Sequence, residues 1–493
     1  MAPGAGVKPP VPRTRTGCLT CRQGKVKCDE EKPTCQRCRR LHFECMWAVP
    51  PPSPHPPGSV RVPRGGRIEL ADGGAVVQSC GPLKQPFVVE FPKADRASLP
   101  YLSHFITFCS RFLAYTNDGQ GNPFQQELVP LAASSSALFH SMLAVAAGHM
   151  ARLEPRHTLP AVQHYSTALR ELNIALSEPT QLSSNSTLGA CLLLCVYEIS
   201  HSEKSLWLQH LRGARDLIMY RGGPRTSDFL CRFFSLLDIS GSLSSGRGPL
   251  IQGNYWLEVG KLSSVSLNQS HLNWPYYDDG SVMVDTFHEL MVYMANLSKL
   301  SALSMTKFGR HNPRLIRDKA MSIQQGLHQW WTSRPTELRD QSNDWRCQPR
   351  SKPLTEPELL EQESFSSIRS CKNACIIYLQ HIIHPTGIQP QGSEVALAAE
   401  SILDIARKTP EGFGLEMGLI WGMFMAGVAI FHDTEAEALI RRKLSSDASI
   451  SIYHADRGLE LLEILWERQH RLNLKLDWRE LQNEMGVQVF LLA

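Results

Sequence analysis

The sequence predicts a mainly α protein with a small, metal-folded module near its N-terminus. Three observations support this fold class. Six of the 14 cysteines lie between Cys18 and Cys45, a proline-rich segment follows Trp47, and apolar residues recur at helical spacing from about Leu99 onward. The 42% hydrophobic and 20% charged composition is typical of soluble globular proteins, and 493 residues allow roughly two to four domains.

The cysteine segment has the spacing C-x2-C-x6-C-x6-C-x2-C-x6-C, in which the second half repeats the first at an offset of 17 residues. Six sulfur donors so close together form either disulfides or a metal site. Pairs spaced C-x2-C favour metal, because two thiolates at this spacing can point at one tetrahedral centre. Disulfides need an oxidising compartment, and residues 1–17 contain no apolar signal segment. The predicted ligands are Cys18, Cys21, Cys28, Cys35, Cys38 and Cys45.

The number of sulfurs constrains the number of ions. One zinc ion binds four thiolates and leaves two over, whereas two zinc ions need eight ligand positions from six sulfurs. Eight positions are filled if two cysteines bridge both ions, and the twofold repeat suggests one bridging cysteine in each copy. A segment this short has almost no apolar core, so bound metal must supply most of its folding free energy.

This segment closely resembles, over about residues 13–47, the fungal Zn2Cys6 binuclear cluster, a DNA-binding module of fungal transcription regulators. The resemblance implies two short helices, each opening at a C-x2-C pair, with the first placed in the DNA major groove. It also implies two zinc ions that share two bridging sulfurs. The implied bridging pair is Cys18 and Cys35, with Cys21 and Cys28 completing one ion and Cys38 and Cys45 the other.

The two copies differ in charge. The offset of 17 pairs Lys25 with His42 and Lys27 with Glu44, so the first copy is basic where the second is mixed. We therefore expect the first copy to contact DNA and the second to support it. In the family, the lysine at the position of Lys25 reaches guanine edges of a CGG triplet, which suits an ammonium donor. The expected phosphate contacts are Arg22, Lys27, Arg39 and Arg40. Gly24 departs from the Arg or Lys usual in the family.

Basic charge is concentrated in the module. Residues 13–45 hold nine Lys or Arg against four Asp or Glu, a net charge of +5, whereas the whole chain carries +4. Such a concentration is typical of a nucleic-acid-binding segment. Arg13 and Arg15 suit phosphate contact or a nuclear import signal, or belong to a solvated tail after a disordered segment at 1–12. A zinc module that binds protein rather than DNA is the alternative.

Residues 48–98 are predicted to form a Pro/Gly-rich linker, with seven prolines between positions 50 and 63. Residues 64–98 are expected to be a loosely structured connector in which PFVVEF (86–91) is the only strand-like patch. No apolar heptad repeat extends over three heptads between 46 and 100, which favours a monomer or a dimer made by the C-terminal domain.

Residues 99–493 are predicted to form one all-α domain. Apolar faces at 3.6-residue spacing lie within 165–176 and 206–218, and Gly222-Gly223-Pro224 ends the second. Asn312-Pro313, Ser393 and Asp433-Thr434 are suitable helix starts. Further helices are expected near 136–153, 187–199, 227–240, 282–303, 314–331, 356–383, 393–408, 415–431, 434–446, 449–471 and 477–491.

A second resemblance covers most of residues 100–493. Four blocks look like the fungal-specific transcription factor domain, which is regulatory and in some relatives binds a small effector. One block departs from the pattern, since Gly422 follows Trp421 where proline is common. The blocks are NPFQQELVPLAASSSALFHSMLAVAAGHMA (122–151), WLQHLRGARDLIMYRGG (207–223), LIWGMFMAGVAIF (419–431) and DWRELQNEMGVQVFLL (477–492).

The most apolar run, 412–431, is too short after Glu416 to cross a bilayer. It is interpreted as a buried helix or, alternatively, as the lining of an effector pocket. The pocket candidates are Trp421, Met423 and Met425.

Other candidate sites have simpler interpretations. The helical positions of Cys371, Cys375, His381 and His384 do not converge, so these cysteines and the pair Cys191 and Cys195 are interpreted as structural. The acidic run 355–364 is an exposed helix start or an activation segment.

No phosphate-binding loop, dinucleotide fingerprint or nucleophile elbow is found in the sequence, so an enzyme is not predicted. The sequence as a whole predicts a nuclear, sequence-specific regulator of RNA polymerase II genes. We expect it to bind duplex DNA with CGG-type triplets, and a small effector or the transcription machinery are its other possible partners.

Overall fold

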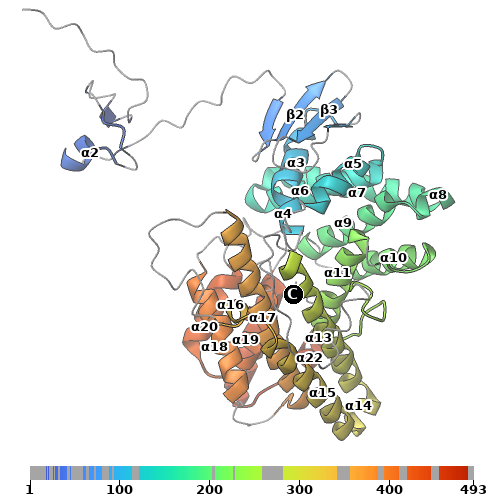
Figure 1. The fold of residues 1–493 in the computed structure, drawn as a ribbon, viewed down its shortest axis with the longest axis vertical. Coiled ribbons are helices and arrows are strands. Elements are labelled where there is room, and N and C mark those ends of the chain that lie inside the picture. Colours follow the sequence, from blue (N-terminus) through green and yellow to red (C-terminus); the bar gives the residue numbers. More distant parts are fainter. Residues whose placement is uncertain are drawn as a thin grey trace, which may run out of the picture. The chain divides into compact units, whose positions relative to one another are not determined.

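The computed structural model divides the chain into two compact units, Met1–Ser59 and Val60–Ala493, which are described separately (Figure 1). The predicted disordered tail at 1–12 lies outside the described residues. The structure describes residues 18, 20–21, 26, 28–31, 34–41, 45, 59–62, 66–71, 74–79, 88–91, 94–113, 122–201, 206–225, 228–257, 281–340, 356–386, 393–409, 419–445 and 455–486.

The described part of the N-terminal unit contains a cluster of cysteine side chains and the short helix α2 (Gln36–Leu41). Helix α2 follows the second C-x2-C pair, and Arg39 N–H donates to the Cys35 carbonyl in its first turn, 2.9 Å away. In the first copy, Thr20 and Cys21 are helical. Buried residues in the described part of this unit are cysteines alone, so no apolar core accounts for its fold.

A four-stranded sheet precedes the helices from Leu99 onward, in the order β1-β2-β3-β4, and the β2–β3 and β3–β4 pairs are antiparallel. Strands β2 and β3 pair in register from Gly66↔Ser79 to Ala71↔Gly74, as in a hairpin with a two-residue loop. The strands are β1 (Ser59–Val62), β2 (Gly66–Ala71), β3 (Gly74–Ser79) and β4 (Val88–Phe91).

The sheet corrects the prediction for residues 64–98. Strand β4 confirms the strand-like patch, but its description as the only one is wrong, because β2 and β3 form a hairpin beside it. The Phe91 ring, 2% exposed, lies 5.7 Å from the Phe139 ring in helix α6, so β4 packs on the helical core.

The remaining described elements are helices, which confirms the mainly α fold class. They are α3 (Leu99–His104), π-helical η1 (Phe105–Cys109), α4 (Ser110–Leu113), π-helical η2 (Phe124–Leu128), α5 (Val129–Ala132), α6 (Ser136–Leu153), 3-10 helical η3 (Pro155–His157), α7 (Thr158–Leu176), α8 (Pro179–Leu182), α9 (Asn185–His201), α10 (Trp207–Tyr220), α11 (Phe229–Ser245), α13 (Ser281–Met305), α14 (Lys307–His311), α15 (Pro313–Thr332), α16 (Thr336–Arg339), α17 (Glu356–Ile383), α18 (Ser393–Lys408), α19 (Leu419–Ala429), α20 (Thr434–Ser445), α21 (Asp456–Leu472) and α22 (Trp478–Met485).

Helix α19 lies in the centre of one helical group, against α17, α18, α20 and α21 (Figure 1). All of its residues are buried, which confirms the buried-helix interpretation for residues 419–429, whereas residues 412–418 of the predicted run lie outside the described residues. A Cβ on Gly422 would lie 1.9 Å from Ser370 Oγ and 3.2 Å from Ser370 Cβ, so α17 packs closely against α19 here and Ser370 would have to shift for a larger residue. None of the described helices combines the length and the apolar character needed to span a bilayer.

A buried polar network joins α22 to α13 and α17. The Asp477 carboxylate receives bonds from Arg479 Nη2 at 2.7 Å and lies 3.0 Å from His381 Nε2. Arg479 Nη1 donates to Ser301 Oγ at 3.1 Å, and Tyr378 OH donates to the same oxygen at 2.7 Å. Despite opposing desolvation, the bonds and charges of His381 and Arg479 hold the pKa of Asp477 well below its usual range. Because each charge has partners, burial of this network is tolerated.

Two histidine pairs lie where α3, α6 and α7 meet. His104 Nε2 is 2.9 Å from His149 Nδ1, and His140 Nδ1 is 3.0 Å from His164 Nδ1. A hydrogen bond between two imidazoles requires one of them to be neutral. Burial, and secondarily the charge of His157, lower the pKa of His104 from its ordinary 6.5 to about 4.

The helical unit should therefore lose stability in mild acid. Because folding lowers the pKa of His104, protonation of this side chain favours the unfolded state. The free energy of unfolding should therefore be highest above about pH 6.5 and should fall by up to roughly 3 kcal/mol between about pH 6.5 and 4. Denaturant unfolding at a series of pH values, for wild type and His104→Gln, measures this. The variant should show a shallower loss of stability below about pH 6.5. Parallel pH curves for the two proteins would contradict the assignment.

Candidate metal centre and nucleic-acid interface

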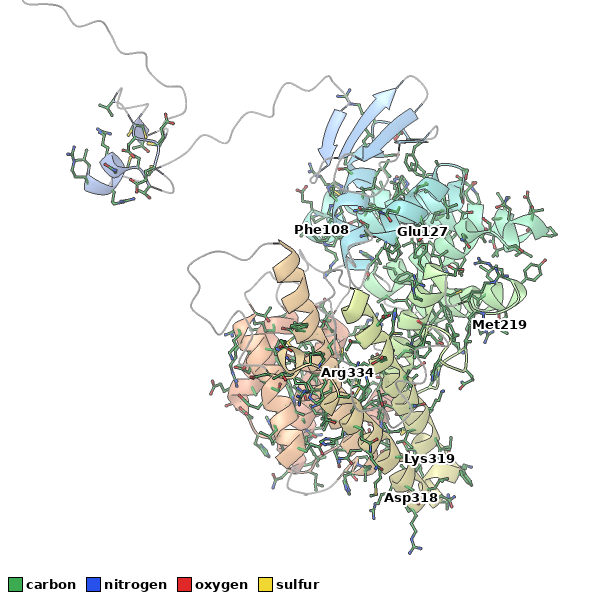
Figure 2. All side chains as sticks on the ribbon, viewed as in Figure 1. Phe108, Glu127, Met219, Asp318, Lys319 and Arg334 are labelled. Atoms are coloured by element: carbon green, nitrogen blue, oxygen red, sulfur yellow. The ribbon has the colours of Figure 1, made fainter. Side chains whose placement is uncertain are left out.

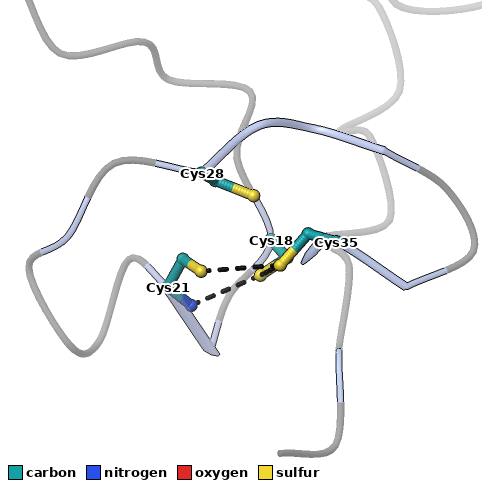
Figure 3. Close-up of side chains that lie close together, drawn as sticks. All are labelled: Cys18, Cys21, Cys28 and Cys35. Atoms are coloured by element: carbon teal, nitrogen blue, oxygen red, sulfur yellow. Dashed lines mark hydrogen bonds between the residues drawn. The ribbon is translucent and has the colours of Figure 1, made fainter. Parts of the chain in front are cut away.

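Six sulfurs of the N-terminal unit form two overlapping groups of four. Within each group the Sγ atoms lie within 4.8 Å of one another, and Cys18 and Cys35 belong to both. The first group adds Cys21 and Cys28 (Figure 3), and the second adds Cys38 and Cys45. Among the described residues, no further group of three or more His, Cys, Asp or Glu is close enough to hold a metal.

The sulfur separations suit zinc rather than disulfides. Cys18 Sγ lies 3.8 Å from the Sγ atoms of Cys35 and Cys38, and Cys21 Sγ lies 3.7 Å from that of Cys35. Sulfurs at about 2.3 Å from a tetrahedral zinc ion lie about 3.8 Å apart, whereas a disulfide brings them to about 2.05 Å. All six thiols are free. The disulfide alternative is therefore wrong for these cysteines.

The crowded thiols ionise unequally without a cation. Burial is the main cause that raises the pKa of Cys38 to about 12, whereas the Cys38 backbone N–H lowers the pKa of Cys35 to about 6. A divalent ion removes this inequality, because a coordinating thiol loses its proton. The donor set therefore fits zinc.

Backbone N–H groups orient the shared sulfurs in the same way in both copies. Cys21 N–H donates to Cys18 Sγ at 3.3 Å, and Cys38 N–H donates to Cys35 Sγ at 3.4 Å. Each bond spans one C-x2-C turn, so the sequence repeat is also a structural repeat. Arg37 Nη1 lies 3.9 Å from Cys21 Sγ and brings a positive charge to the first group. Such donors to a ligand orient it and balance its charge.

Asp29 connects the two copies. Its carboxylate accepts Gln36 N–H at 3.1 Å and Glu31 N–H at 3.1 Å, so it caps the first turn of α2 from seven residues upstream. The sequence did not predict this role, because a capping residue normally lies directly before its helix. The sequence also did not predict the contact of Arg37 with the Cys21 sulfur. This contact joins the two copies and has no counterpart in the 17-residue repeat.

The predicted DNA contacts are only partly described. Arg39 donates to Glu31 Oε1 at 3.0 Å and to the Thr34 carbonyl at 3.2 Å, and both charged side chains remain exposed. Arg40 is exposed in the last turn of α2. The other five predicted contacts lie outside the described residues: Arg13, Arg15, Arg22, Lys25 and Lys27.

The candidate residues of the helical unit are buried. The Trp421 ring meets the Tyr378 ring edge-on at 6.5 Å, and Met423 and Met425 are fully buried in α19. An effector lined by these three residues stays a prediction.

The structural interpretation of the cysteine pairs agrees with their surroundings. Cys191 and Cys195 donate to carbonyls of α10, at 3.1 and 3.4 Å. Cys371 and Cys375 are fully buried in α17, while His381 of the same helix is bonded to Asp477.

Comparison with known proteins agrees with both resemblances. A model described as the fungal Zn(2)-Cys(6) binuclear cluster domain matches residues 16–54, and one described as the fungal specific transcription factor domain matches residues 100–492. The chain belongs to the fungal Zn2Cys6 transcription factors. Members of this family bind zinc and DNA through the cysteine module and regulate transcription.

Several fungal regulators are similar to this Zn2Cys6 transcription factor. A Zn(2)-C6 fungal-type transcription factor, afumD, of Aspergillus fumigatus is 26% identical over 41% of this chain and 53% of its own length. The aspercryptin biosynthesis cluster-specific transcription regulator atnN of Emericella nidulans is 25% identical over 49% of this chain and 42% of its own. Transcription factor lfc1 of Flammulina velutipes is 58% identical over 8% of this chain and 14% of its own. The chain thus spans about half the length, or less, of these relatives. No solved structure is significantly similar.

Loss of the Asp29 cap should weaken metal binding. Asp29→Ala leaves the first turn of α2 without its acceptor, and we expect the zinc affinity to fall by roughly 10-fold. Asp29→Asn keeps one acceptor oxygen, so its zinc affinity should lie between those of Asp29→Ala and wild type. Competition with a chromogenic zinc chelator measures all three proteins. An alanine variant that holds zinc as tightly as wild type would show that Asp29 does not support the metal centre.

Proposed function

We propose that this chain is a nuclear regulator of RNA polymerase II genes that binds CGG-type triplets in duplex DNA through a two-zinc cluster. The observation that supports it most is the overlap of two four-sulfur groups at Cys18 and Cys35. Six sulfurs then complete the coordination of two zinc ions, with Cys18 and Cys35 as the bridging ligands. The predicted limits of this module are residues 13 and 47.

The charge of the module suits this role. Two zinc ions and six thiolates carry a charge of −2, which nearby arginines such as Arg37 offset. Arg13, Arg15, Arg22, Lys27, Arg39 and Arg40 are the proposed phosphate contacts, and Lys25 the proposed base contact. The exposed Arg39–Glu31 pair contributes little to stability, so phosphate can displace the carboxylate from Arg39.

The helical unit is proposed to be regulatory. It binds a small effector or the transcription machinery, and the chain acts as a monomer or as a dimer joined through this unit rather than as an enzyme. A zinc-stabilised adaptor that binds only protein is the competing function. Binding of the full chain to duplex DNA separates the two, because phosphate contacts make the affinity fall steeply with salt. Binding to protein partners but not to DNA would favour the adaptor.

Lys25→Ala should relax the preference for CGG. One lost bidentate base contact removes roughly 1–3 kcal/mol of discrimination while the phosphate contacts remain. Selection of bound duplexes from random DNA reports the preferred motif. Arg40→Ala is the control, because loss of a phosphate contact should weaken binding to all sequences equally. An unchanged motif with equal enrichment for Lys25→Ala would exclude its role in base recognition.

Replacement of a shared sulfur should affect both zinc ions. We expect Cys18→Ala and Cys35→Ala to lose both ions, and Cys21→Ala to lose chiefly the ion of the first group. Metal content and circular dichroism of the module measure the retained zinc and structure. If all three variants retained equal zinc, the assignment of Cys18 and Cys35 as bridging ligands would fail.

A further inference from the structure

A second basic surface lies on the helical unit, at the junction of α14 and α15. Lys307 and Arg310 belong to α14, and Arg314, Arg317 and Lys319 to the first turns of α15. All five side chains are exposed, and Asp318 is the one acidic residue in this stretch. We call these five residues the basic corner. Figure 2 shows Asp318 and Lys319 at the outer end of the helical unit.

The charge of the basic corner is largely unbalanced. Arg310 lies 3.3 Å from Glu480, and both side chains are 56% exposed, so this pair is weak. Within the described part of the chain, the other four cations have no carboxylate at ion-pair distance. Several exposed arginines elsewhere on the unit are paired, as in Arg407–Glu400, Arg441–Glu463 and Arg468–Glu484. Others, such as Arg212, Arg247 and Arg471, are exposed singly. The basic corner differs from both because it brings five exposed cations together within residues 307–319.

The basic corner is held on a firm scaffold. Gly309 N–H donates to Thr306 Oγ1 at 3.0 Å, which caps α14. A Cβ on Gly309 would lie 2.0 Å from the Leu303 carbonyl oxygen, so α14 packs tightly against the end of α13. Ile316 and Ala320 bury the inner face of α15. The backbone that carries the cations therefore needs no ordering when a ligand binds.

We propose that the basic corner is a second DNA-binding surface, which contacts phosphates of the duplex beside the site of the zinc module. This proposal rests on the proposed function, since the module must first bind DNA. Cations three residues apart on a helix are neighbours and suit the regularly spaced phosphates of a duplex. The module and the corner belong to one chain, so binding by the module raises the local DNA concentration to about the millimolar range. At this local concentration, weak contacts between the basic corner and the flanking phosphates are formed for a large part of the time.

The geometry disfavours a nuclear import signal at this position. Such signals are basic runs of about five to eight residues. The five cations of the basic corner are separated in sequence and lie on two folded helices. An acidic protein partner is the remaining alternative, and the test below separates it from DNA.

The test compares two triple variants of the full chain with wild type. The first is Arg314→Gln/Arg317→Gln/Lys319→Gln, which removes three charges from the basic corner. The matched control removes three charges from arginines elsewhere on the unit that are also exposed and, among the described residues, without an ion pair. This control variant is Arg212→Gln/Arg247→Gln/Arg471→Gln. Equal melting temperatures and zinc contents establish that each variant is folded.

Dissociation constants are measured over a series of salt concentrations with two duplexes. One is only as long as the zinc-module site, and the other carries the same site with flanking DNA. On the flanked duplex, the slope of log affinity against log salt is negative, and the corner variant should make it less steep by roughly two to three. This follows from roughly 0.9 per lost phosphate contact. The control should match wild type, and the short duplex should show no difference. Arg314→Lys/Arg317→Lys, which keeps the charge, should also match wild type.

Two results separate failure of this inference from failure of the proposed function. If wild type shows no salt-dependent binding to either duplex, the proposed function fails and this inference fails with it. If wild type binds DNA but the corner variant has the wild-type slope on flanked DNA, the inference alone is wrong. Retained DNA affinity together with lost binding to an acidic protein would assign the corner to protein instead.

Discussion

The arrangement of the N-terminal unit depends on the sharing of two sulfurs between two groups of four. Cys18 and Cys35 are the first residues of their C-x2-C turns, and each receives an N–H bond from the second cysteine of its turn. No apolar side chain other than cysteine is buried in the described part of this unit. The path of the described chain in this unit is therefore held by sulfur and metal rather than by hydrophobic burial.

The two units are stabilised by different physical means. Apolar helices such as α19 and the buried Asp477–Arg479 pair stabilise the helical unit, and neither involves metal. Removal of zinc should thus unfold the DNA-binding module and leave the helical unit folded. Both units also present cations to solvent, at α2 and at the basic corner. In the proposed account, the small unit supplies the sequence preference and the large unit adds phosphate contacts that do not depend on sequence.

Much of the fold could be predicted because periodicity and capping are local. The predicted bounds of α6, α17 and α18 agree with the structure, and Asp433 Oδ1 accepts Ala436 N–H at 3.0 Å as its helix-start pattern indicates. The β2–β3 hairpin was missed since its strands are short and flanked by glycine, although Asp72-Gly73 between two apolar runs was an available signal. Contacts of Asp29 with α2, and of His381 with Asp477, could not be predicted, because folding brings together residues that sequence spacing does not relate.

The most direct test of the account is the number of zinc ions bound by the reduced full chain, measured by native mass spectrometry. The shared-sulfur arrangement predicts two zinc ions per chain, released together when a strong chelator is added. A chain that binds a single zinc ion, or whose two ions leave independently, would contradict the central claim that Cys18 and Cys35 serve both metal positions.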